Sequence, residues 1–322
     1  MSSATLAINN LTSVAVLTFV FGFFAARLKS DVRIPEPVYQ VISVYLLLGI
    51  GLKGGHSLHG THINSFIGPA LATVALGVLI PLIAYWTLRF IKTLSQINRG
   101  AIAAHYGSTS LVTFSAALLF IENNGIKVEG YATALLTLLE IPGLIVGIYM
   151  GSRSHASEVK WRKTLLEVFL GKTILLLVGG LIIGFVTTQT GYEKVKPFFI
   201  DLQSGILVLF LLHLGYMAGS NWLEIKKTGK QLIIFGVLFP VFSSLLGLIA
   251  GKFVGLSMGG AAILAVLCAS ASYIAAPAAV SVALPKANLP LALTSSIGIT
   301  FPFNLVVGIP LYVECAKLIF RL

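Results

Sequence analysis

The chain is 322 residues long; 57% of its residues are hydrophobic and only 10% are charged, against roughly 25% charged in a typical soluble domain. Its mean hydropathy of +0.94 excludes a water-soluble globule and a disordered chain. The 22 Lys and Arg residues behind the net charge of +11 are scattered along the chain and do not form the basic stripe of a nucleic-acid-binding protein. Composition therefore predicts an integral membrane protein.

Ten apolar segments follow one another along the chain, each near the roughly 20 residues that a helix needs to cross a bilayer. The first two are slightly short, and the last two are longer and contain Pro and Gly. The segments are Leu11–Ala26, Pro37–Leu52, Phe66–Leu88, Gly100–Ile121, Gly130–Ser152, Thr173–Tyr192, Leu202–Leu223, Gln231–Gly251, Phe253–Pro285 and Ala287–Val313. They predict an all-α integral membrane fold with ten transmembrane helices.

The basic residues predict how these helices are oriented. No Lys or Arg precedes the first apolar segment, which therefore differs from a signal peptide and is expected to stay as a helix. With the N-terminus outside, 15 of the 22 Lys and Arg residues fall in cytoplasmic loops, as the positive-inside rule requires. We therefore expect a multi-pass protein of the plasma or inner membrane with both termini on the external side.

The two halves of the chain share features at an offset of about 160 positions. The matching pairs are Gly51/Gly55 with Gly215/Gly219, Gly77–Pro81 with Gly236–Pro240, Ser108/Ser110 with Ser270/Ser272, and Pro142 with Pro302. With five helices in each half, the second half must cross the membrane in the opposite sense, which is an inverted repeat typical of secondary transporters. Chance similarity in a chain rich in Gly, Leu and Val is the alternative.

Two clusters of small and hydroxyl residues occupy the fourth and ninth apolar segments, at His105–Ser110 and at Ala269–Tyr273. Within a membrane a helix is broken only where its backbone lines a cavity or is covered by protein. The half-helix after a break offers backbone N–H groups to an anion, while freed carbonyl and hydroxyl oxygens suit Na⁺. The aligned clusters predict a substrate site, and close helix packing through small residues is the alternative.

Three polar residues in the apolar segments are predicted to bind Na⁺: Thr113, Glu140 and Asn304. Glu140 is the only acid in its segment, and an ionisable group at that depth is usually functional; it could instead carry a proton or have no role. We expect His105 and His213 to be packing residues. The other histidines and the two cysteines show no metal-binding pattern, so no cofactor is predicted beyond Na⁺ as the coupling ion. Because no Lys or Arg lies mid-segment, anion binding would depend on the cation, which is the basis of symport.

Three strings resemble the cyanobacterial SbtA-type sodium-dependent bicarbonate transporters: Ile34–Pro37 with the following Leu46–Gly55, His105–Phe114 (HYGSTSLVTF), and Ala269–Ala276 (ASASYIAA). The resemblance extends over essentially the whole chain. It implies inverted five-helix repeats, a gate domain, a core domain with two broken crossing helices, a homotrimer, and a PII-like regulatory protein on the cytoplasmic face. The substrate-binding residues that it implies are Gly107, Ser108, Thr109, Ser110, Ala269, Ser270, Ala271 and Ser272.

The same resemblance divides the chain into gate, core and linker. The expected ranges are 1–65 for gate helices 1–2, 66–152 for core helices 3–5, 153–163 for a short basic cytoplasmic linker, 164–230 for gate helices 6–7, and 231–322 for core helices 8–10. The linker is shorter than in familiar members of the family.

The sequence thus favours a sodium-coupled bicarbonate symporter, not an enzyme, that works by alternating access in the membrane lipid. Four alternatives stay open: a sodium-coupled carrier of another small anion, a cation/proton antiporter with Glu140 as its acid, an ion channel, and a membrane-embedded hydrolase. The hydrolase would need a nucleophile beside a base, for which Ser108 near His105 is a weak signal.

Overall fold

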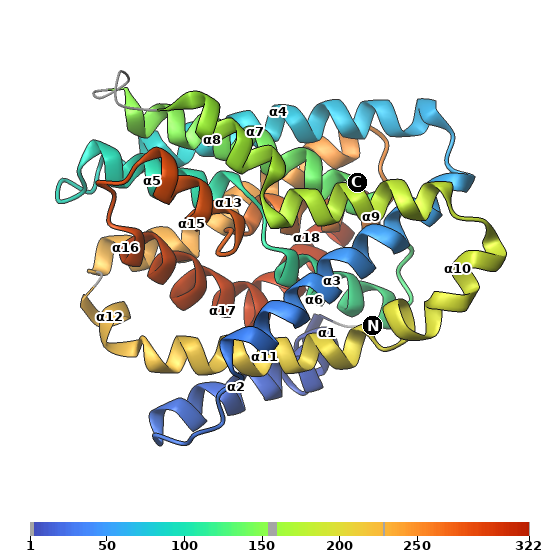
Figure 1. Ribbon diagram of the computed structural model, residues 1–322, viewed down its shortest axis with the longest axis horizontal. Helices are drawn as coiled ribbons and strands as arrows, with labels where there is room; N and C mark the ends of the chain where they lie inside the picture. Colours follow the sequence, from blue (N-terminus) through green and yellow to red (C-terminus); the bar gives the residue numbers. More distant parts are fainter. Residues whose placement is uncertain (1–2, 154–159, 228, 322) are drawn as a thin grey trace.

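A computed structural model describes residues 3–153, 160–227 and 229–321, and every regular element in these ranges is a helix. The long helices α4, α9 and α11 run along the long axis of the molecule (Figure 1). The α-helices are α1 (Ser3–Leu11), α2 (Val14–Arg27), α3 (Glu36–Ser57), α4 (Ile63–Leu88), α5 (Gln96–Gly107), α6 (Leu111–Asn123), α7 (Ala132–Ser152), α8 (Trp161–Leu170), α9 (Lys172–Val186), α10 (Gln189–Lys196), α11 (Gln203–Ser220), α12 (Trp222–Lys227), α13 (Lys230–Phe253), α14 (Met258–Ala269), α15 (Ala275–Ala283), α16 (Leu289–Leu293), α17 (Phe301–Phe303) and α18 (Ile309–Arg321). One 3-10 turn, η1 (Leu58–Gly60), and three π-helical segments, η3 (Pro197–Asp201), η4 (Thr294–Thr300) and η5 (Asn304–Gly308), complete them.

The predicted all-α membrane protein is confirmed. Among the described residues, seven helical segments are long and apolar enough to cross a membrane, and the pair α8–α9, bent by 46°, makes an eighth if it is one span. Two shorter apolar helices, α2 and α14, occupy the first and ninth predicted segments. The count of ten spans stays a prediction, because α2 and α14 are too short to qualify by length alone.

Several helix ends differ from the predicted segments, and polar caps explain two of them. The sixth segment was expected to continue to Tyr192, but α9 ends at Val186 because Thr188 starts a new helix by accepting a hydrogen bond from the amide of Gly191. In the ninth segment, α13 runs through Phe253, and Ser257 then caps α14 by accepting a bond from the amide of Gly260. Hydrophobicity indicates which segments lie within the membrane, but it does not locate the polar caps at which helices start.

Helices pack in two close pairs, α2 against α11 and α3 against α9. In each pair, one of the glycines that match between the two halves of the sequence lies against a backbone carbonyl group of the other helix. A Cβ atom on Gly55 would come within 2.0 Å of the Leu181 carbonyl oxygen, and one on Gly215 would come equally close to that of Phe19. These glycines therefore allow the close backbone approach that holds membrane helices together.

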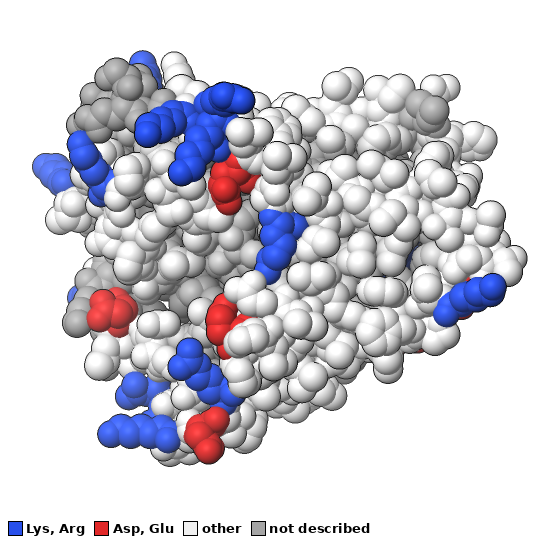
Figure 2. All heavy atoms as spheres, viewed as in Figure 1, with Lys and Arg blue, Asp and Glu red and all other residues white. Residues whose placement is uncertain are grey.

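The charged residues are unevenly distributed along the molecule. Figure 2 shows most of the visible Lys and Arg side chains at the end where Figure 1 places α5, α8 and α12, whereas most of the remaining face is uncharged. This basic end is the one that the sequence predicts to face the cytoplasm. Part of the predicted linker 153–163 lies here, and its residues 154–159 are outside the described residues.

Candidate substrate site at the crossing of two broken helices

The first break separates α5 from α6. α5 ends at Gly107, and Ser108 is extended, with φ −95° and ψ 165°. α6 begins again at Leu111 because the Ser110 hydroxyl accepts a hydrogen bond from the amide of Thr113. This N-cap satisfies one of the amides that a helix start leaves unpaired. The break therefore falls inside the predicted cluster His105–Ser110.

The second break has a similar geometry in the other half of the chain. α14 ends at Ala269, and Ser270 is extended, with φ −86° and ψ 164°. The chain resumes helical structure at α15, where the Ser272 hydroxyl accepts a bond from the amide of Ala276. The breaks at Ser108 and Ser270 thus have nearly the same backbone conformation, 162 positions apart.

The two breaks are in direct contact. The Ser272 amide donates to the His105 carbonyl oxygen at 2.8 Å, and the Ser110 amide donates to the Ser270 hydroxyl at 3.0 Å. The Ser110 hydroxyl also donates to the Tyr273 hydroxyl at 3.1 Å. All five residues are buried. Polar backbone that would be costly in lipid is thereby paired across the crossing.

Glu140 of α7 lies beside this crossing. Its side chain is only 1% exposed and lines a small cavity together with Thr109, Ser110, Ser272 and other residues. The Ser108 hydroxyl is also buried, and it has no hydrogen-bond partner among the described residues. Oε2 of Glu140 and Oγ1 of Thr109 have no hydrogen-bond partner among the described residues. Buried polar atoms are nearly always satisfied, so these oxygens are candidates to bind a cation.

The other two residues predicted to bind Na⁺ are placed differently. The Thr113 hydroxyl donates to the Ser110 hydroxyl at 2.9 Å, next to the first break. Asn304 is buried against the second break, where its Nδ2 donates to the Ala269 carbonyl oxygen at 2.8 Å and its Oδ1 accepts from Tyr312 at 2.7 Å. Asn304 is therefore already used in stabilising the end of α14, and it does not line the small cavity beside Glu140.

A larger cavity of about 380 Å³ leads toward the crossing from one side. It shares Thr173, Tyr273, Ile274 and Ala275 with the small cavity beside Glu140. Lys172 also lines it, with its Nζ 3.2 Å from Oε1 of Gln40. Lys172 directly precedes the predicted segment Thr173–Tyr192 and is the first residue of α9. The sequence alone gives no signal that it lines a cavity.

On another side of the molecule, α3 and α6 are joined by an ion pair. Lys53 Nζ lies 3.0 Å from Glu122 Oε1, and both side chains are partly exposed. The two residues line a separate cavity of about 230 Å³. The sequence predicts Lys53 on the external side of the membrane and Lys172 on the cytoplasmic side.

The histidines make ring contacts and backbone bonds. His105 Nδ1 lies 2.8 Å from the Ala101 carbonyl oxygen. Neither His105 Nε2 nor the Ser108 hydroxyl has a hydrogen-bond partner among the described residues, so the Ser108–His105 pair that a hydrolase needs is not formed. The His213 ring centre lies 4.5 Å from that of Tyr39 with the rings tilted by 30°, and His56 stacks on Tyr192 with ring centres 3.7 Å apart. No group of three His, Cys, Asp or Glu residues that could hold a metal ion is found in the part of the chain that the structure describes.

A family model described as the Na⁺-dependent bicarbonate transporter superfamily matches residues 14–317. The chain belongs to this superfamily. The match covers both breaks, Glu140 and the cavity that contains Lys172, so the whole candidate site lies inside the region that the family model matches. A comparison with curated proteins finds no match. Membership makes the chain a multi-pass, sodium-dependent bicarbonate transporter by family, and the crossing is its candidate transport site.

Proposed function

We propose that this chain is a Na⁺-coupled bicarbonate symporter that works by alternating access, with both solutes bound where the two breaks meet. The observation that carries the proposal is the direct contact between the breaks, with Ser110 bonded to Ser270 and Ser272 to His105, beside the buried carboxyl group of Glu140. A contact of two interrupted helices at the interface of two repeats is where secondary transporters bind their solutes.

The anion is held by the backbone at the breaks. The substrate-binding residues are Gly107, Ser108, Thr109, Ser110, Ala269, Ala271, Ser270 and Ser272. Amides at the start of α6 and α15 carry the positive ends of the helix dipoles, and the small side chains let the anion approach them. Bicarbonate is small, and it can also donate its own hydroxyl proton to a serine or carbonyl oxygen.

Sodium is held by oxygens next to the anion. Glu140 and Thr113 are the proposed ligands, and Asn304 contributes less because its carbonyl oxygen already accepts a bond from Tyr312. The cation lowers the cost of placing the anion in a site without a basic side chain at its centre. Each solute therefore raises the affinity for the other, by a coupling free energy of about 1–3 kcal/mol, and this coupling makes transport a symport.

Alternating access follows from movement of a core against a gate. The gate is 1–65 with 164–230, and the core is 66–152 with 231–322. The two glycine-mediated pairs, α2–α11 and α3–α9, join the halves of the gate. Access from the side of Lys172 through the 380 Å³ cavity, together with the Lys53–Glu122 pair on the external side, supports an inward-facing state.

An inverted repeat is part of the proposal. The helix caps Ser95 and Ser257 and the breaks Ser108 and Ser270 share an offset of 162 positions. In such a repeat, α2 corresponds to α9 and α3 corresponds to α11. The pair α2–α11 then corresponds to the pair α9–α3, so the repeat relates the two observed pairs to each other. Counting α8–α9 as one span and including α2 and α14 with the other seven segments gives the ten spans of two five-helix repeats.

Removal of sodium tests the proposal directly. In proteoliposomes at fixed pH, we expect uptake of labelled bicarbonate to require a Na⁺ gradient and to stop when Na⁺ is replaced by K⁺. Sodium-independent uptake, or none, would contradict symport. Inhibition by an excess of unlabelled formate or acetate would instead indicate a carrier of other small anions.

The buried Glu140 favours one second candidate, a cation/proton antiporter. In that case a pH-sensitive dye inside the vesicles would report Na⁺-driven proton movement without bicarbonate, and Glu140→Gln would abolish it. A symporter that uses Glu140 only to bind Na⁺ gives no such signal in bicarbonate-free buffer.

A homotrimer and a PII-like partner on the cytoplasmic face complete the proposal. The mass of the purified protein tests the homotrimer.

The external ion pair gives a further prediction about the transport cycle. We expect Lys53→Gln to speed modification of a cysteine introduced at Ser115, a lining residue of the 230 Å³ cavity, by a membrane-impermeant thiol reagent. The increase should be at most about fivefold, because an exposed ion pair contributes up to about 1 kcal/mol. Cys315→Ser provides the background, and the charge-exchanged pair Lys53→Glu with Glu122→Lys should restore the slow rate. An unchanged rate in Lys53→Gln would mean that the pair does not hold the external side closed.

A further inference from the structure

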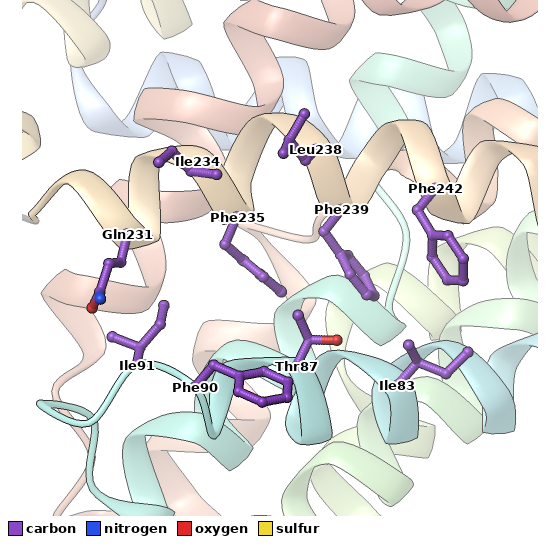
Figure 3. Close-up of a pocket in the computed structure, with 10 residues that line it drawn as sticks. All are labelled: Ile83, Thr87, Phe90, Ile91, Gln231, Ile234, Phe235, Leu238, Phe239 and Phe242. Carbon is purple, nitrogen blue, oxygen red and sulfur yellow. The ribbon is translucent and has the colours of Figure 1, made fainter.

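An apolar groove of about 430 Å³ lies between the end of α4 and the start of α13, away from the candidate transport site. Figure 3 shows Phe235 and Phe239 of α13 directed toward Thr87 of α4 and Phe90 just beyond its end, and Phe242 on the side of Ile83. Phe90 is 82% exposed, so the groove is open on the surface of a protein whose surroundings are lipid. Its volume is within the range of sites that bind small ligands.

Three exposed basic residues adjoin lining residues of the groove in the chain, and one of them, Arg89, places its guanidinium 4.5 Å from the centre of the Trp86 ring. Arg89 and Lys92 flank Phe90 and Ile91 in the chain, Lys230 directly precedes Gln231, and all three basic residues are exposed. The chain contains no Asp or Glu from residue 80 to residue 121 or from residue 230 to residue 313. The groove therefore combines an apolar lining with basic residues that adjoin it in the chain.

We propose that this groove binds an anionic phospholipid, with one acyl chain against the phenylalanines and its phosphate beside Arg89, Lys92 and Lys230. The apolar lining accounts for binding of the acyl chain, and the charge of the three basic residues accounts for the preference for an anionic headgroup. Each basic residue near a membrane surface raises the affinity for an anionic lipid by about fivefold. This site is independent of the transport site and of the proposed symport.

The experiment measures thermal unfolding of the full-length protein in detergent with added phosphatidylglycerol or phosphatidylcholine of the same acyl chains, and counts bound lipid by native mass spectrometry. Phosphatidylglycerol should stabilise the wild-type protein more strongly and stay bound. Thr87→Trp, which fills the groove, should remove this effect. The matched control is Val74→Trp, because Val74 is 39% exposed on the same helix but outside the groove, and this variant should behave as wild type.

A second set of variants tests the headgroup without altering the apolar lining. Arg89→Gln, Lys92→Gln and Lys230→Gln together should weaken phosphatidylglycerol binding by at least about tenfold and leave phosphatidylcholine unaffected, whereas Lys194→Gln at the opposite end of the molecule should change nothing. Equal stabilisation by both lipids, or equal losses in Thr87→Trp and Val74→Trp, would overturn the proposal in favour of ordinary surrounding lipid. A change in oligomeric mass in Thr87→Trp would overturn it in favour of contact with a second copy.

Discussion

Ser110→Pro is expected to abolish sodium-driven bicarbonate uptake, whereas Ser110→Thr should retain most of it. The Ser110 amide is the donor that joins the first break to the Ser270 hydroxyl of the second. Proline has no N–H to donate, so the Ser270 hydroxyl loses this partner and the buried contact between the breaks is lost. Threonine keeps the amide and a hydroxyl that can cap α6.

Uptake into proteoliposomes at a saturating Na⁺ gradient checks this prediction. Because Ser110 is buried, each variant is first compared with the wild-type protein by its thermal unfolding and by its elution as a single species. A folded Ser110→Pro variant with wild-type uptake would place the transport site away from the crossing. Loss of uptake in Ser110→Thr as well would contradict the role given to the amide, because threonine retains it.

The positions of the two breaks could be predicted from the sequence because their causes are local. Small hydroxyl residues cap helix starts and also compete with helical hydrogen bonding, so the strings around Ser108 and Ser270 point to interruptions wherever they occur in an apolar segment. The common offset of the two strings adds that the interruptions correspond. For these reasons, the break in each helix was predictable to within a few residues.

The contacts around the breaks could not be predicted in the same way. Glu140 and Asn304 occupy similar depths in their segments, yet Glu140 lines the cavity beside the crossing whereas Asn304 bonds to Ala269 and Tyr312. Which face of a helix meets a neighbour depends on packing, and these apolar helices carry little periodicity to reveal it. That Lys172 lines a cavity could not be predicted for a related reason, because a charge next to an apolar segment looks the same whether it lies in a loop or in the first turn of a helix.

Glu140→Gln is expected to raise the Na⁺ concentration needed for half-maximal uptake by at least about tenfold, since an interaction with a charged group contributes about 1.5–3 kcal/mol. Glutamine nearly preserves the shape of the side chain but removes its negative charge. If Glu140 binds Na⁺, the loss should appear mainly as a weaker apparent affinity for Na⁺, and saturating Na⁺ should recover much of the maximal rate.

The matched control is Glu193→Gln, in which an exposed acid on α10 is changed in the same way, and it should leave the Na⁺ dependence unaltered. Uptake is measured over a range of Na⁺ at fixed bicarbonate and then over a range of bicarbonate at fixed Na⁺. Because the two solutes stabilise each other, Glu140→Gln should also weaken bicarbonate binding at low Na⁺ but much less at high Na⁺. An unchanged Na⁺ dependence would remove Glu140 from the sodium site, and weaker bicarbonate binding at every Na⁺ concentration would assign it to the anion instead.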